Sequence, residues 1–473
     1  MIRKTKIVAT IGPSSSSREI LMKMIIKGVN VCRLNFSHLT HRKAANIITK
    51  IKSINQELHV HTAIIADLQG PKIRVGNLDT PIHLKKNTTW KFTSKKSDQN
   101  AIFINHPNFA KKAKKGDKIF LDDGKIQFKV IETRGLNSIK VKVVFGGELS
   151  SNKGVIFLDS KIITPSLTKK DKEDLKFILK KKIEWIGLSF VKSADDIITL
   201  NKIIKKNRKS TARVIAKIEK PQAIHNINSI IEVSDAIMVA RGDLGVEVPL
   251  HKVPVYQKMI VDKCIDQSKP VIIATQMLDS MKDNISATRA EVNDVANSVI
   301  DGADALMLSE ETSNGKNPIK VIDTMRMIIR DVEQSKHNIS KKRRTKIPSK
   351  NSRFLSSAIC SSACQLAELT HAKAIITLTH SGYNTIKTSS HRPYSFIYTF
   401  TNNHAILNTL SLVWGVKGFY YERGTTTDQT IKETKERLTK EGLLKKGNIV
   451  VNLTSIPVNE KGMTNMIKIS KVE

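Results

Sequence analysis

Long apolar runs and cysteines are both scarce in this chain of 473 residues. No apolar stretch approaches the roughly 18 residues that a membrane span requires. The basic start, residues 1–6, leads into a strand-like segment where a signal peptide would have an apolar core. The four cysteines form no CxxC pair, which argues against a structural zinc site and a disulfide framework. We therefore expect a cytoplasmic protein with reduced thiols and no membrane partner.

Acidic and aromatic residues are also few. Lys and Arg number 79 against 43 Asp and Glu, a formal net charge of +36, and aromatic residues make up 5% of the chain. An excess of positive charge is typical of nucleic-acid-binding proteins, but these gather arginines and aromatic side chains on one surface. Here the lysines are spread through every segment. We expect no specific nucleic-acid partner, although a basic nucleic-acid-binding protein remains an alternative that charge alone favours.

The chain does contain a repeated pattern of a short apolar strand followed by an amphipathic helix. Eight strand candidates occur at residues 7–11, 29–36, 62–68, 185–191, 214–219, 236–240, 271–276 and 305–308. Near-continuous apolar runs are expected of parallel strands that are buried on both faces. Eight alternating βα units predict an α/β fold of the (β/α)8 TIM barrel type.

About a hundred residues between the third and fourth strands have a different texture. Segments 126–130 and 139–143 alternate apolar and polar residues, and turn dipeptides such as Gly116-Asp117 lie near them. This pattern predicts a small β-barrel domain inserted in a βα loop. Such an insertion would overhang the mouth of the barrel as a lid.

The last part of the chain predicts a separate α/β domain. A helix that follows Pro318 is expected to end near Gln334, and the polar segment 335–352 is interpreted as a linker. A helix at 358–369 and strands at 374–378 and 396–400 follow. The predicted domains are a barrel at 1–69 and 168–340, an inserted lid at 70–167 and a C-terminal α/β domain at 341–473.

Polar side chains gather at the carboxyl ends of the predicted strands, where barrels of this type place their catalytic groups. The set comprises Arg33, Asn35, Ser37, Asp67, Lys217, Glu219, Arg241, Asp243, Thr275 and Ser309. The two-residue period of a strand places Lys217 and Glu219 on one face. Because so many polar residues at equivalent ends are hard to explain as packing, we interpret them as a candidate active site.

The residue types of this set favour phosphoryl or enolate chemistry. Glu219 and Asp243 suit Mg2+, which takes one or two carboxylates and completes its octahedron with water and substrate oxygens. Lys217 and Arg33 supply positive charge, as phosphoryl transfer or the stabilisation of an enolate requires. The glycine-rich segment 240–245 could receive an anion on its N–H groups. Ion pairs within the protein, or a metal-dependent lyase of the pyruvate-aldolase type, remain alternatives.

Several motifs, over nearly the whole chain, resemble those of the pyruvate kinases. They are residues 5–13 (TKIVATIGP), 33–38 (RLNFSH), 67–74 (DLQGPKIR), 216–219 (AKIE), 238–247 (MVARGDLGVE), 274–277 (ATQM) and 288–291 (TRAE). The resemblance implies a phosphotransferase that moves the phosphoryl group of phosphoenolpyruvate to ADP, giving pyruvate and ATP. This is the last step of glycolysis, and the enolpyruvate is protonated afterwards.

The resemblance also implies roles for the residues around the phosphoryl group. By match to the family's motifs, Glu219 and Asp243 would hold Mg2+ or Mn2+. Lys217 would neutralise the phosphoryl group during transfer, and Arg33 would bind the same phosphate. Each of these roles is implied by the match of that residue to a motif of the family.

Further matches concern the carboxylate of the substrate and the proton. Backbone N–H groups near Gly242 and Asp243, together with the Thr275 hydroxyl, would receive the carboxylate. Thr275 and Ser309 belong to the region that delivers a proton to the enolate. The positions that match the family's nucleotide site are Pro13, Asn35, His38, Arg74 and Lys170.

One departure concerns potassium. Asn35, Ser37, Asp67 and the carbonyl of Leu68 match the site where many pyruvate kinases bind K+. However, Lys72 stands where K+-dependent members tend to carry Glu. Because an ammonium could supply the missing charge itself, we expect no strict K+ requirement.

The C-terminal domain resembles the family's regulatory domain. Thr379, Ser381 and Gly382 occupy the position of a loop that binds allosteric sugar phosphates, so an effector of that class is a candidate partner, and a purely structural dimerisation domain is the alternative. The family resemblance implies a homotetramer. Tyr383 and Asn384 depart from the small hydroxyl residues expected beside the glycine.

Overall fold

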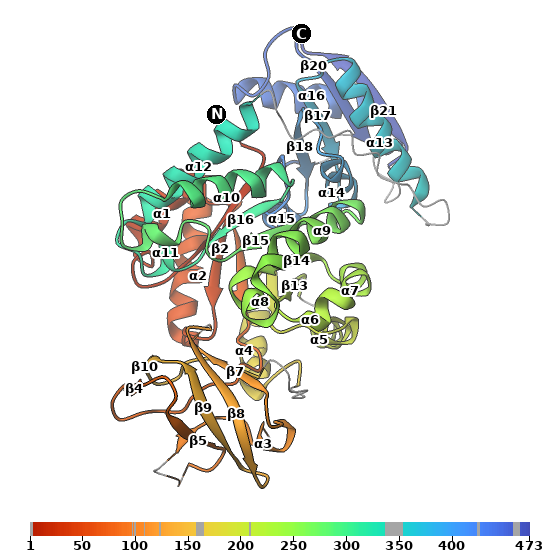
Figure 1. The fold of residues 1–473 in the computed structure, drawn as a ribbon. Helices are drawn as coiled ribbons and strands as arrows, with labels where there is room; N and C mark the ends of the chain where they lie inside the picture. The colour runs from red at the N-terminus through yellow and green to blue at the C-terminus, as the bar shows by residue number, and fades with distance from the viewer. Residues whose placement is uncertain are drawn as a thin grey trace.

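The computed structural model describes residues 3–96, 98, 101–107, 109–122, 124–157, 165–207, 210–335, 353–422, 426–456 and 464–473. Three regions follow one another in space (Figure 1). A barrel occupies the middle, the inserted strands lie at one end of it, and the C-terminal domain lies at the other end.

The eight predicted strands form a closed parallel barrel, which confirms the predicted fold class. They are β1 (Lys6–Thr10), β2 (Val31–Asn35), β3 (Ala63–Asp67), β12 (Trp185–Leu188), β13 (Arg213–Ile218), β14 (Ala236–Ala240), β15 (Val271–Ala274) and β16 (Ala305–Leu308). Around the barrel the order is β1-β16-β15-β14-β13-β12-β3-β2, and the ring closes between β1 and β2, where Val8 is paired with Val31. Six strands end one to three residues before their predicted carboxyl ends, and the two largest differences fall at the turns of Phe190 and Thr275, where φ is positive.

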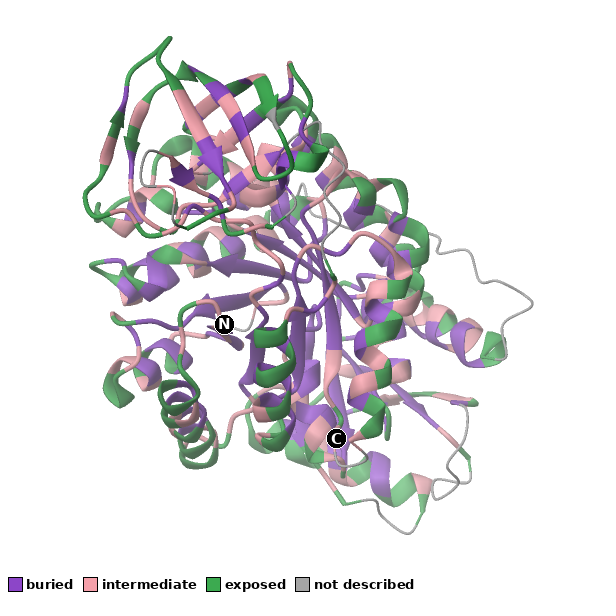
Figure 2. Ribbon diagram, turned by 90° about the horizontal axis from the view of Figure 1, so that it is seen from below, coloured by how far each residue is buried: buried purple, intermediate pink, exposed green. Residues whose placement is uncertain are grey.

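Side chains of the strands alternate between two apolar clusters. Val8, Val31 and Ile65 belong to a cluster made of barrel-strand residues and Leu412, whereas Ile7 and Ile64 belong to the cluster shared with the helices. Both faces of each strand are therefore buried, as the near-continuous apolar runs predicted. Figure 2 shows the buried strands at the centre and helices with exposed outer sides around them.

The helical layer contains long amphipathic helices and shorter segments at the strand ends. They are α1 (Arg18–Ile26), α2 (His41–Glu57), α4 (Lys169–Lys180), α5 (Ala194–Lys206), α6 (Pro221–His225), α7 (Ile227–Val233), α8 (Arg241–Glu247), η1 (Leu250–Lys252), α9 (Val253–Asp266), η2 (Asp279–Lys282), α10 (Arg289–Ile300), α11 (Glu310–Ser313) and α12 (Pro318–Gln334). Capping boxes begin α4 at Thr168, α5 at Ser193 and α10 at Thr288. The helix expected to run from Pro318 to Gln334 has these bounds.

The insertion has its own apolar core, which includes Phe92, Phe128 and Val141. Its elements are β4 (Ile82–Leu84), β5 (Thr89–Thr93), β6 (Ile102–Phe103), α3 (Phe109–Lys112), β7 (Lys118–Leu121), β8 (Ile126–Arg134), β9 (Ser138–Phe145), β10 (Gly147–Leu149) and β11 (Val155–Phe157). Six strands form one sheet in the order β11-β7-β8-β9-β5-β6, and β10 and β4 form a separate ribbon. Leu84 and Leu149 of the ribbon join the same core, so the small β domain is built from two sheets closed over one interior.

The C-terminal domain is a five-stranded sheet with helices. Its elements are α13 (Phe354–Leu369), β17 (Ala374–Leu378), α14 (Tyr383–Ser390), β18 (Phe396–Thr401), α15 (His404–Leu410), β19 (Val416–Tyr420), α16 (Thr427–Lys440), β20 (Ile449–Thr454) and β21 (Met466–Lys471). The order is β19-β18-β17-β20-β21, and β21 alone of these described strands runs antiparallel to its neighbour. Helix α13 begins four residues before the predicted start. Most of the predicted linker, residues 336–352, lies outside the described residues.

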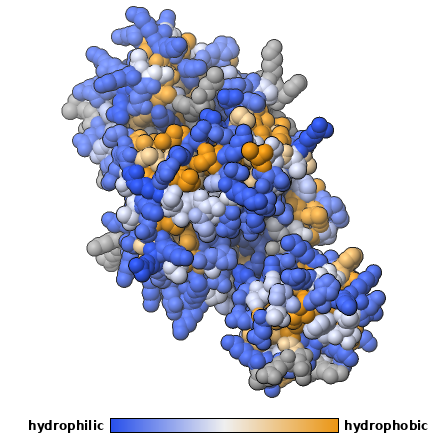
Figure 3. Space-filling model, turned by 90° about the vertical axis from the view of Figure 1, so that its left-hand side faces the viewer, coloured by the Kyte–Doolittle hydropathy of each residue, from blue (hydrophilic) through white to orange (hydrophobic). Residues whose placement is uncertain are grey.

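The surface is mainly hydrophilic on the face drawn in Figure 3, with apolar residues in patches between the polar ones. In the described part of the chain no helix combines the length and the apolarity needed to cross a membrane.

Candidate active site

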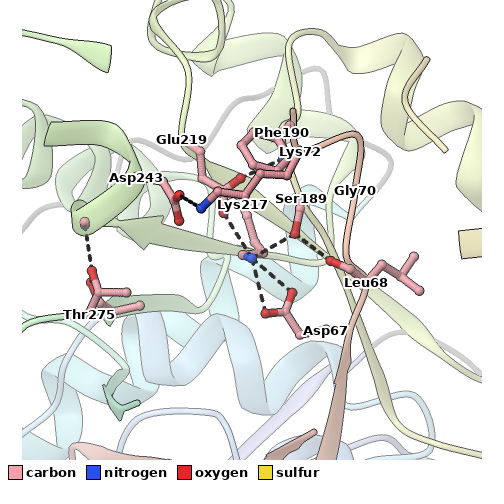
Figure 4. A network of polar contacts seen from close by, with 12 residues as sticks. Asp67, Leu68, Gly70, Lys72, Ser189, Phe190, Lys217, Glu219, Asp243 and Thr275 are labelled. Atoms are coloured by element: carbon pink, nitrogen blue, oxygen red, sulfur yellow. Dashed lines mark hydrogen bonds and ion pairs between the residues drawn. The ribbon is translucent and has the colours of Figure 1, made fainter. Parts of the chain in front are cut away.

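The ammonium of Lys217 lies at the centre of a polar network at the carboxyl ends of β3, β12 and β13 (Figure 4). Its Nζ is 2.8 Å from Ser189 Oγ, 3.1 Å from Asp67 Oδ1 and 3.0 Å from Glu219 Oε1. Ser189 Oγ in turn donates to the carbonyl of Leu68, at 2.7 Å. One buried cation therefore joins the ends of three adjacent strands.

The guanidinium of Arg33 shares the Asp67 carboxylate with Lys217. Arg33 Nε donates to Asp67 Oδ2 at 2.9 Å, a second guanidinium nitrogen contacts the same oxygen, and Nη1 donates to Thr10 Oγ1 at 3.0 Å. Asp67 is 1% exposed. Because a buried carboxylate is stable only when it is paired, Asp67 holds the two cations side by side.

The local charges favour the charged forms of Lys217 and Asp67. Burial disfavours the charged form of Lys217, but the carboxylates of Asp67 and Glu219 outweigh that cost and raise the pKa of the ammonium. Burial would also raise the pKa of Asp67, but Lys217 and Arg33 outweigh it and hold this pKa below its usual value. Lys217 is thus a permanent cation and is unsuited to proton transfer near neutral pH.

Glu219 and Asp243 are the two acids that the sequence assigned to a metal ion. Burial raises the pKa of Glu219 despite Lys217, and the neighbouring charge of Asp243 raises it further. Asp243 Oδ1 lies 3.0 Å from Lys72 Nζ, and Phe190 N–H donates to Glu219 Oε2 at 2.8 Å. The described residues contain no cluster of three or more His, Cys, Asp or Glu side chains that could hold a metal. Two mutually repelling carboxylates still fit Mg2+, since this ion retains water and substrate ligands.

Strained turns follow two of the strands that build the site. Phe190, after β12, and Thr275 and Gln276, after β15, have φ values of 56°, 71° and 54°, a region that residues with a side chain seldom adopt. The strain places the Phe190 N–H on Glu219 and the Thr275 hydroxyl 2.7 Å from the Gly242 N–H. Such conformations cost roughly 1–3 kcal/mol each and persist where the surrounding structure enforces them.

Gly242 and Thr275 approach each other closely. A Cβ atom at residue 242 would lie 3.3 Å from Thr275 Oγ1, so a larger residue would fit there only if the Thr275 side chain shifted slightly. Arg241, the preceding residue, donates to the carbonyls of Thr275 at 2.9 Å and Gln276 at 3.1 Å and so supports the strained turn.

The buried Ser309 hydroxyl has no hydrogen-bond partner among the described residues, and Ser309 N–H donates to Glu311 Oε2 at 2.6 Å.

The positions that match a nucleotide site lie around the end of β2 and in the insertion. Burial lowers the pKa of His38, and the charges of Arg74 and Arg33 lower it further, so these cations act on a common region. Lys170 Nζ donates to the Phe36 carbonyl at 2.6 Å. Arg74 donates to the Asn152 carbonyl within the insertion at 2.9 Å, and Pro13 is exposed after β1.

Three of the four groups that match a potassium site, all except the Ser37 hydroxyl, have oxygens that accept bonds from this chain. Asp67 is paired with Arg33 and Lys217, the Leu68 carbonyl accepts from Ser189, and Asn35 Oδ1 accepts from Ser37 N–H at 3.0 Å. An ion that needs a cage of oxygens would compete with these donors. The residues therefore do not fit K+ in this arrangement.

The predicted effector loop is closed by contacts within the chain. Thr379 Oγ1 accepts from Gly382 N–H at 3.0 Å, and Gly382 has φ 82° immediately before α14. The Ser381 carbonyl accepts from Arg213 of the barrel at 3.0 Å. Asn384 donates to the Leu378 carbonyl at 2.9 Å, so this departure from the family's pattern has a structural role.

Sequence reasoning missed two hydroxyls of the site, Thr10 and Ser189. Each lies at the carboxyl end of a barrel strand. The Thr10 hydroxyl accepts from Arg33, and the Ser189 hydroxyl accepts from Lys217. Applying the strand-end rule to every strand would have found both.

Comparison with known proteins agrees with this geometry. The family model for the pyruvate kinase barrel domain matches residues 2–322, and that for the pyruvate kinase alpha/beta domain matches residues 357–470. A pyruvate kinase of Clostridium acetobutylicum is 36% identical over 100% of both chains, and one of Corynebacterium glutamicum is 38% identical over 99% of this chain and 98% of the relative.

A crystal structure of a pyruvate kinase from Cryptosporidium parvum matches with a TM-score of 0.91 at 32% identity, over 100% of this chain and 96% of that one. The lyase alternative is thereby removed. The chain belongs to the pyruvate kinase family, the phosphotransferases that transfer the phosphoryl group of phosphoenolpyruvate to ADP and release pyruvate and ATP.

Proposed function

We propose that Lys217 and Arg33 stabilise the phosphoryl group while it moves from phosphoenolpyruvate to ADP. The observation that carries this assignment is the buried ammonium of Lys217, held by Asp67, Glu219 and Ser189. Negative charge spreads over the phosphoryl oxygens in the transition state, and a fixed cation in a site with little water stabilises that charge strongly. Arg33 is fixed beside it by the same carboxylate.

Glu219 and Asp243 would hold Mg2+ or Mn2+. The family uses a divalent ion, and when bound this ion supplies charge neutralisation at the phosphate and carboxylate of the substrate. Asp243 would exchange its contact with Lys72 for the ion. Glu219 keeps its bond from Phe190 N–H, which orients the second oxygen.

The carboxylate of the substrate would bind at the start of α8. There the N–H group of Gly242 donates to the Thr275 hydroxyl at 2.7 Å, the N–H group of Asp243 follows in the same turn, and Thr275 lies in a strained turn. Exposed N–H groups at a helix start suit an anion. The free hydroxyl of Ser309 supports a role for Thr275 and Ser309 in the region that protonates the enolate.

ADP would bind over the residues Pro13, Asn35, His38, Arg74 and Lys170. Arg74 belongs to the insertion, so closure of that domain would bring it to the nucleotide and exclude water. The sharing of the K+-site oxygens with Arg33, Lys217 and Ser189, together with the charge of Lys72, supports activity without K+. We also propose that a sugar phosphate binds at Thr379, Ser381 and Gly382. The protein would form a homotetramer and lie in the cytoplasm.

The assignment of Lys217 is tested by steady-state kinetics of Lys217→Met in a coupled assay for ADP-dependent pyruvate formation. We expect kcat to fall by several orders of magnitude with KM values within a few fold, because the lost contact acts in the transition state. The variant leaves Glu219 without its cation and Asp67 with Arg33 alone, so its Tm must be measured alongside. Lys220→Met, which removes the nearby Lys220–Glu247 pair, is the matched control. A folded Lys217→Met variant with more than about a tenth of wild-type kcat would remove the assignment.

A further inference from the structure

A buried carboxylate behind the proposed nucleotide site joins two residues that no catalytic assignment connects. Asp174 of α4 is 3% exposed, and its two oxygens have different partners. Oδ2 lies 2.6 Å from Lys170 Nζ, one turn earlier on the same helix, and Oδ1 lies 2.7 Å from Nε2 of His41 at the start of α2.

The position of the Lys170 ammonium is fixed by two acceptors. Besides Asp174, Nζ donates to the Phe36 carbonyl at 2.6 Å, immediately beyond the end of β2. An ammonium has three N–H donors, so these bonds leave one for a ligand. A free lysine loses on the order of 2 kcal/mol of side-chain entropy when a ligand orders it. Here that order exists before the ligand arrives, which favours binding.

His41 holds the carboxylate in the orientation that this arrangement needs. Its ring stacks on Phe177 of α4, with centroids 4.5 Å apart and planes within 1°. The ring therefore cannot turn freely, and its bond to Oδ1 directs Oδ2 towards Lys170. A surface lysine–carboxylate pair alone would contribute little, but a buried carboxylate with both oxygens bonded is rigid.

We propose that Asp174 and His41 are positioning residues for the nucleotide: they hold Lys170 so that its remaining N–H group meets a phosphate oxygen of ADP. This inference rests on the proposed contact between Lys170 and the nucleotide. It predicts that the two residues affect the binding of ADP and leave the binding of phosphoenolpyruvate unchanged. A residue that only stabilised the packing of α2 on α4 would change both or neither.

The test compares KM for ADP, KM for phosphoenolpyruvate, kcat and Tm in five variants of the full chain. Lys170→Gln examines the nucleotide contact itself, and Asp174→Ala removes the positioning carboxylate. His41→Gln keeps a donor near the position of Nε2, whereas His41→Ala removes it. Lys52→Gln is the control, because it deletes a lysine–carbonyl bond between α2 and the end of α4, to Lys181 at 2.8 Å, that involves neither Lys170 nor Asp174.

We expect Lys170→Gln and Asp174→Ala to raise KM for ADP about tenfold, the effect of one charge-assisted hydrogen bond. His41→Ala should raise KM for ADP about threefold, His41→Gln should restore much of the loss, and Lys52→Gln should have no effect. KM for phosphoenolpyruvate should stay within about twofold in all five.

The outcomes distinguish the contact of Lys170 with the nucleotide from the positioning role of Asp174 and His41. If Lys170→Gln leaves KM for ADP unchanged, the nucleotide contact is wrong and the positioning role falls with it. If Lys170→Gln raises KM for ADP but folded Asp174→Ala and His41→Ala proteins do not, the positioning role alone is wrong. Equal rises in both KM values would assign Asp174 and His41 to packing.

Discussion

At the scale of single residues, this site is governed by the pairing of buried charge. Lys217 is 8% exposed and remains charged because Asp67 and Glu219 lie beside it. The carboxylates, in turn, remain in the interior because the cations are there. A bound substrate phosphate would therefore enter a site in which the positive charge is already fixed in position.

The positive charge of Lys72 beside Asp243 bears on the requirement for K+. Its ammonium lies 3.0 Å from Asp243 Oδ1, so Lys72→Glu replaces a local positive charge with a negative one. We expect the variant to require K+, with kcat/KM at least about tenfold lower in K+-free buffer than with K+, since the monovalent cation would restore the missing charge.

Steady-state rates in potassium-free and potassium-containing buffers, with Lys72→Gln as the neutral control, measure this effect. Equal rates of Lys72→Glu in the two buffers would count against charge replacement. Wild type should show little dependence on K+.

At the scale of elements, the first turn of α4 joins both crossings of the chain between the barrel and the insertion. The chain leaves the barrel at Gly70 and returns before Thr168. The carboxylate of Asp171 accepts from Gly70 N–H at 3.1 Å on Oδ1 and from Thr168 N–H at 2.8 Å on Oδ2. Gly70 has φ 69°, and a Cβ there would lie 2.8 Å from the Phe190 ring. One buried carboxylate thus binds both connections, and we expect it to support the hinge of the lid.

Asp171→Ala should loosen this hinge. The expected result is faster hydrogen exchange of the Gly70 amide and a lower kcat, because the lid would close less reproducibly over the site. Loss of the helix cap should also cost about 1 kcal/mol of stability.

Asp196→Ala separates these effects. Asp196 caps α5 in the same way, accepting from Lys192 and Ser193 N–H groups at 2.8 Å and 3.2 Å, but these bonds involve neither connection between the barrel and the insertion. This control should lose similar stability with normal exchange at Gly70. If both variants behaved alike at Gly70, Asp171 would have only a capping role.

At the scale of the whole molecule, the insertion and the C-terminal domain occupy opposite ends of the barrel (Figure 1). The C-terminal domain is held by buried polar contacts at the amino ends of the strands. Arg392 pairs with Asp304 at 2.7 Å, and Lys6 Nζ donates to the Val416 carbonyl at 2.6 Å. Any signal from the effector loop would have to cross this interface to reach Ser309 at the other end of β16.

Lys6 makes the stability of this interface depend on pH. Burial and, to a smaller extent, the charge of Arg3 lower the pKa of Lys6 from 10.5 to about 7, against the opposing effects of Glu333 and Asp304. Between these values the unfolded chain binds a proton that the folded chain releases, so the free energy of unfolding rises with pH. The contribution of Lys6 between pH 7 and pH 9 is about 2 kcal/mol.

Thermal unfolding at both pH values measures this contribution. Wild type should gain more Tm between pH 7 and pH 9 than Lys6→Met does, and Lys23→Met, at an exposed lysine of α1, should follow wild type. A Lys6→Met protein with the full wild-type gain would show that Lys6 does not titrate in this range.

The sequence predicted much of the fold because the barrel strands carry a strong local signal. All eight β-rich apolar runs are strands of the barrel. The acids, cations and glycines at the ends of these runs predicted the position of the candidate active site. Thr10 and Ser189 were missed, because a single hydroxyl in an apolar strand looks like ordinary packing. The contact between Asp174 and His41 could not be predicted, because these residues are 133 positions apart in the sequence.

The sequence by itself determined the eight strand–helix units, the insertion and the acids and cations at the strand ends, since these depend on periodicity and residue type. Only the tertiary structure decided which charges share a partner. Asp67 and Lys217 are 150 residues apart, yet they lie within 3.1 Å of each other. The reason is physical: the free energy of a buried charge depends on the atoms within a few ångströms, and the closure of the barrel decides which atoms those are.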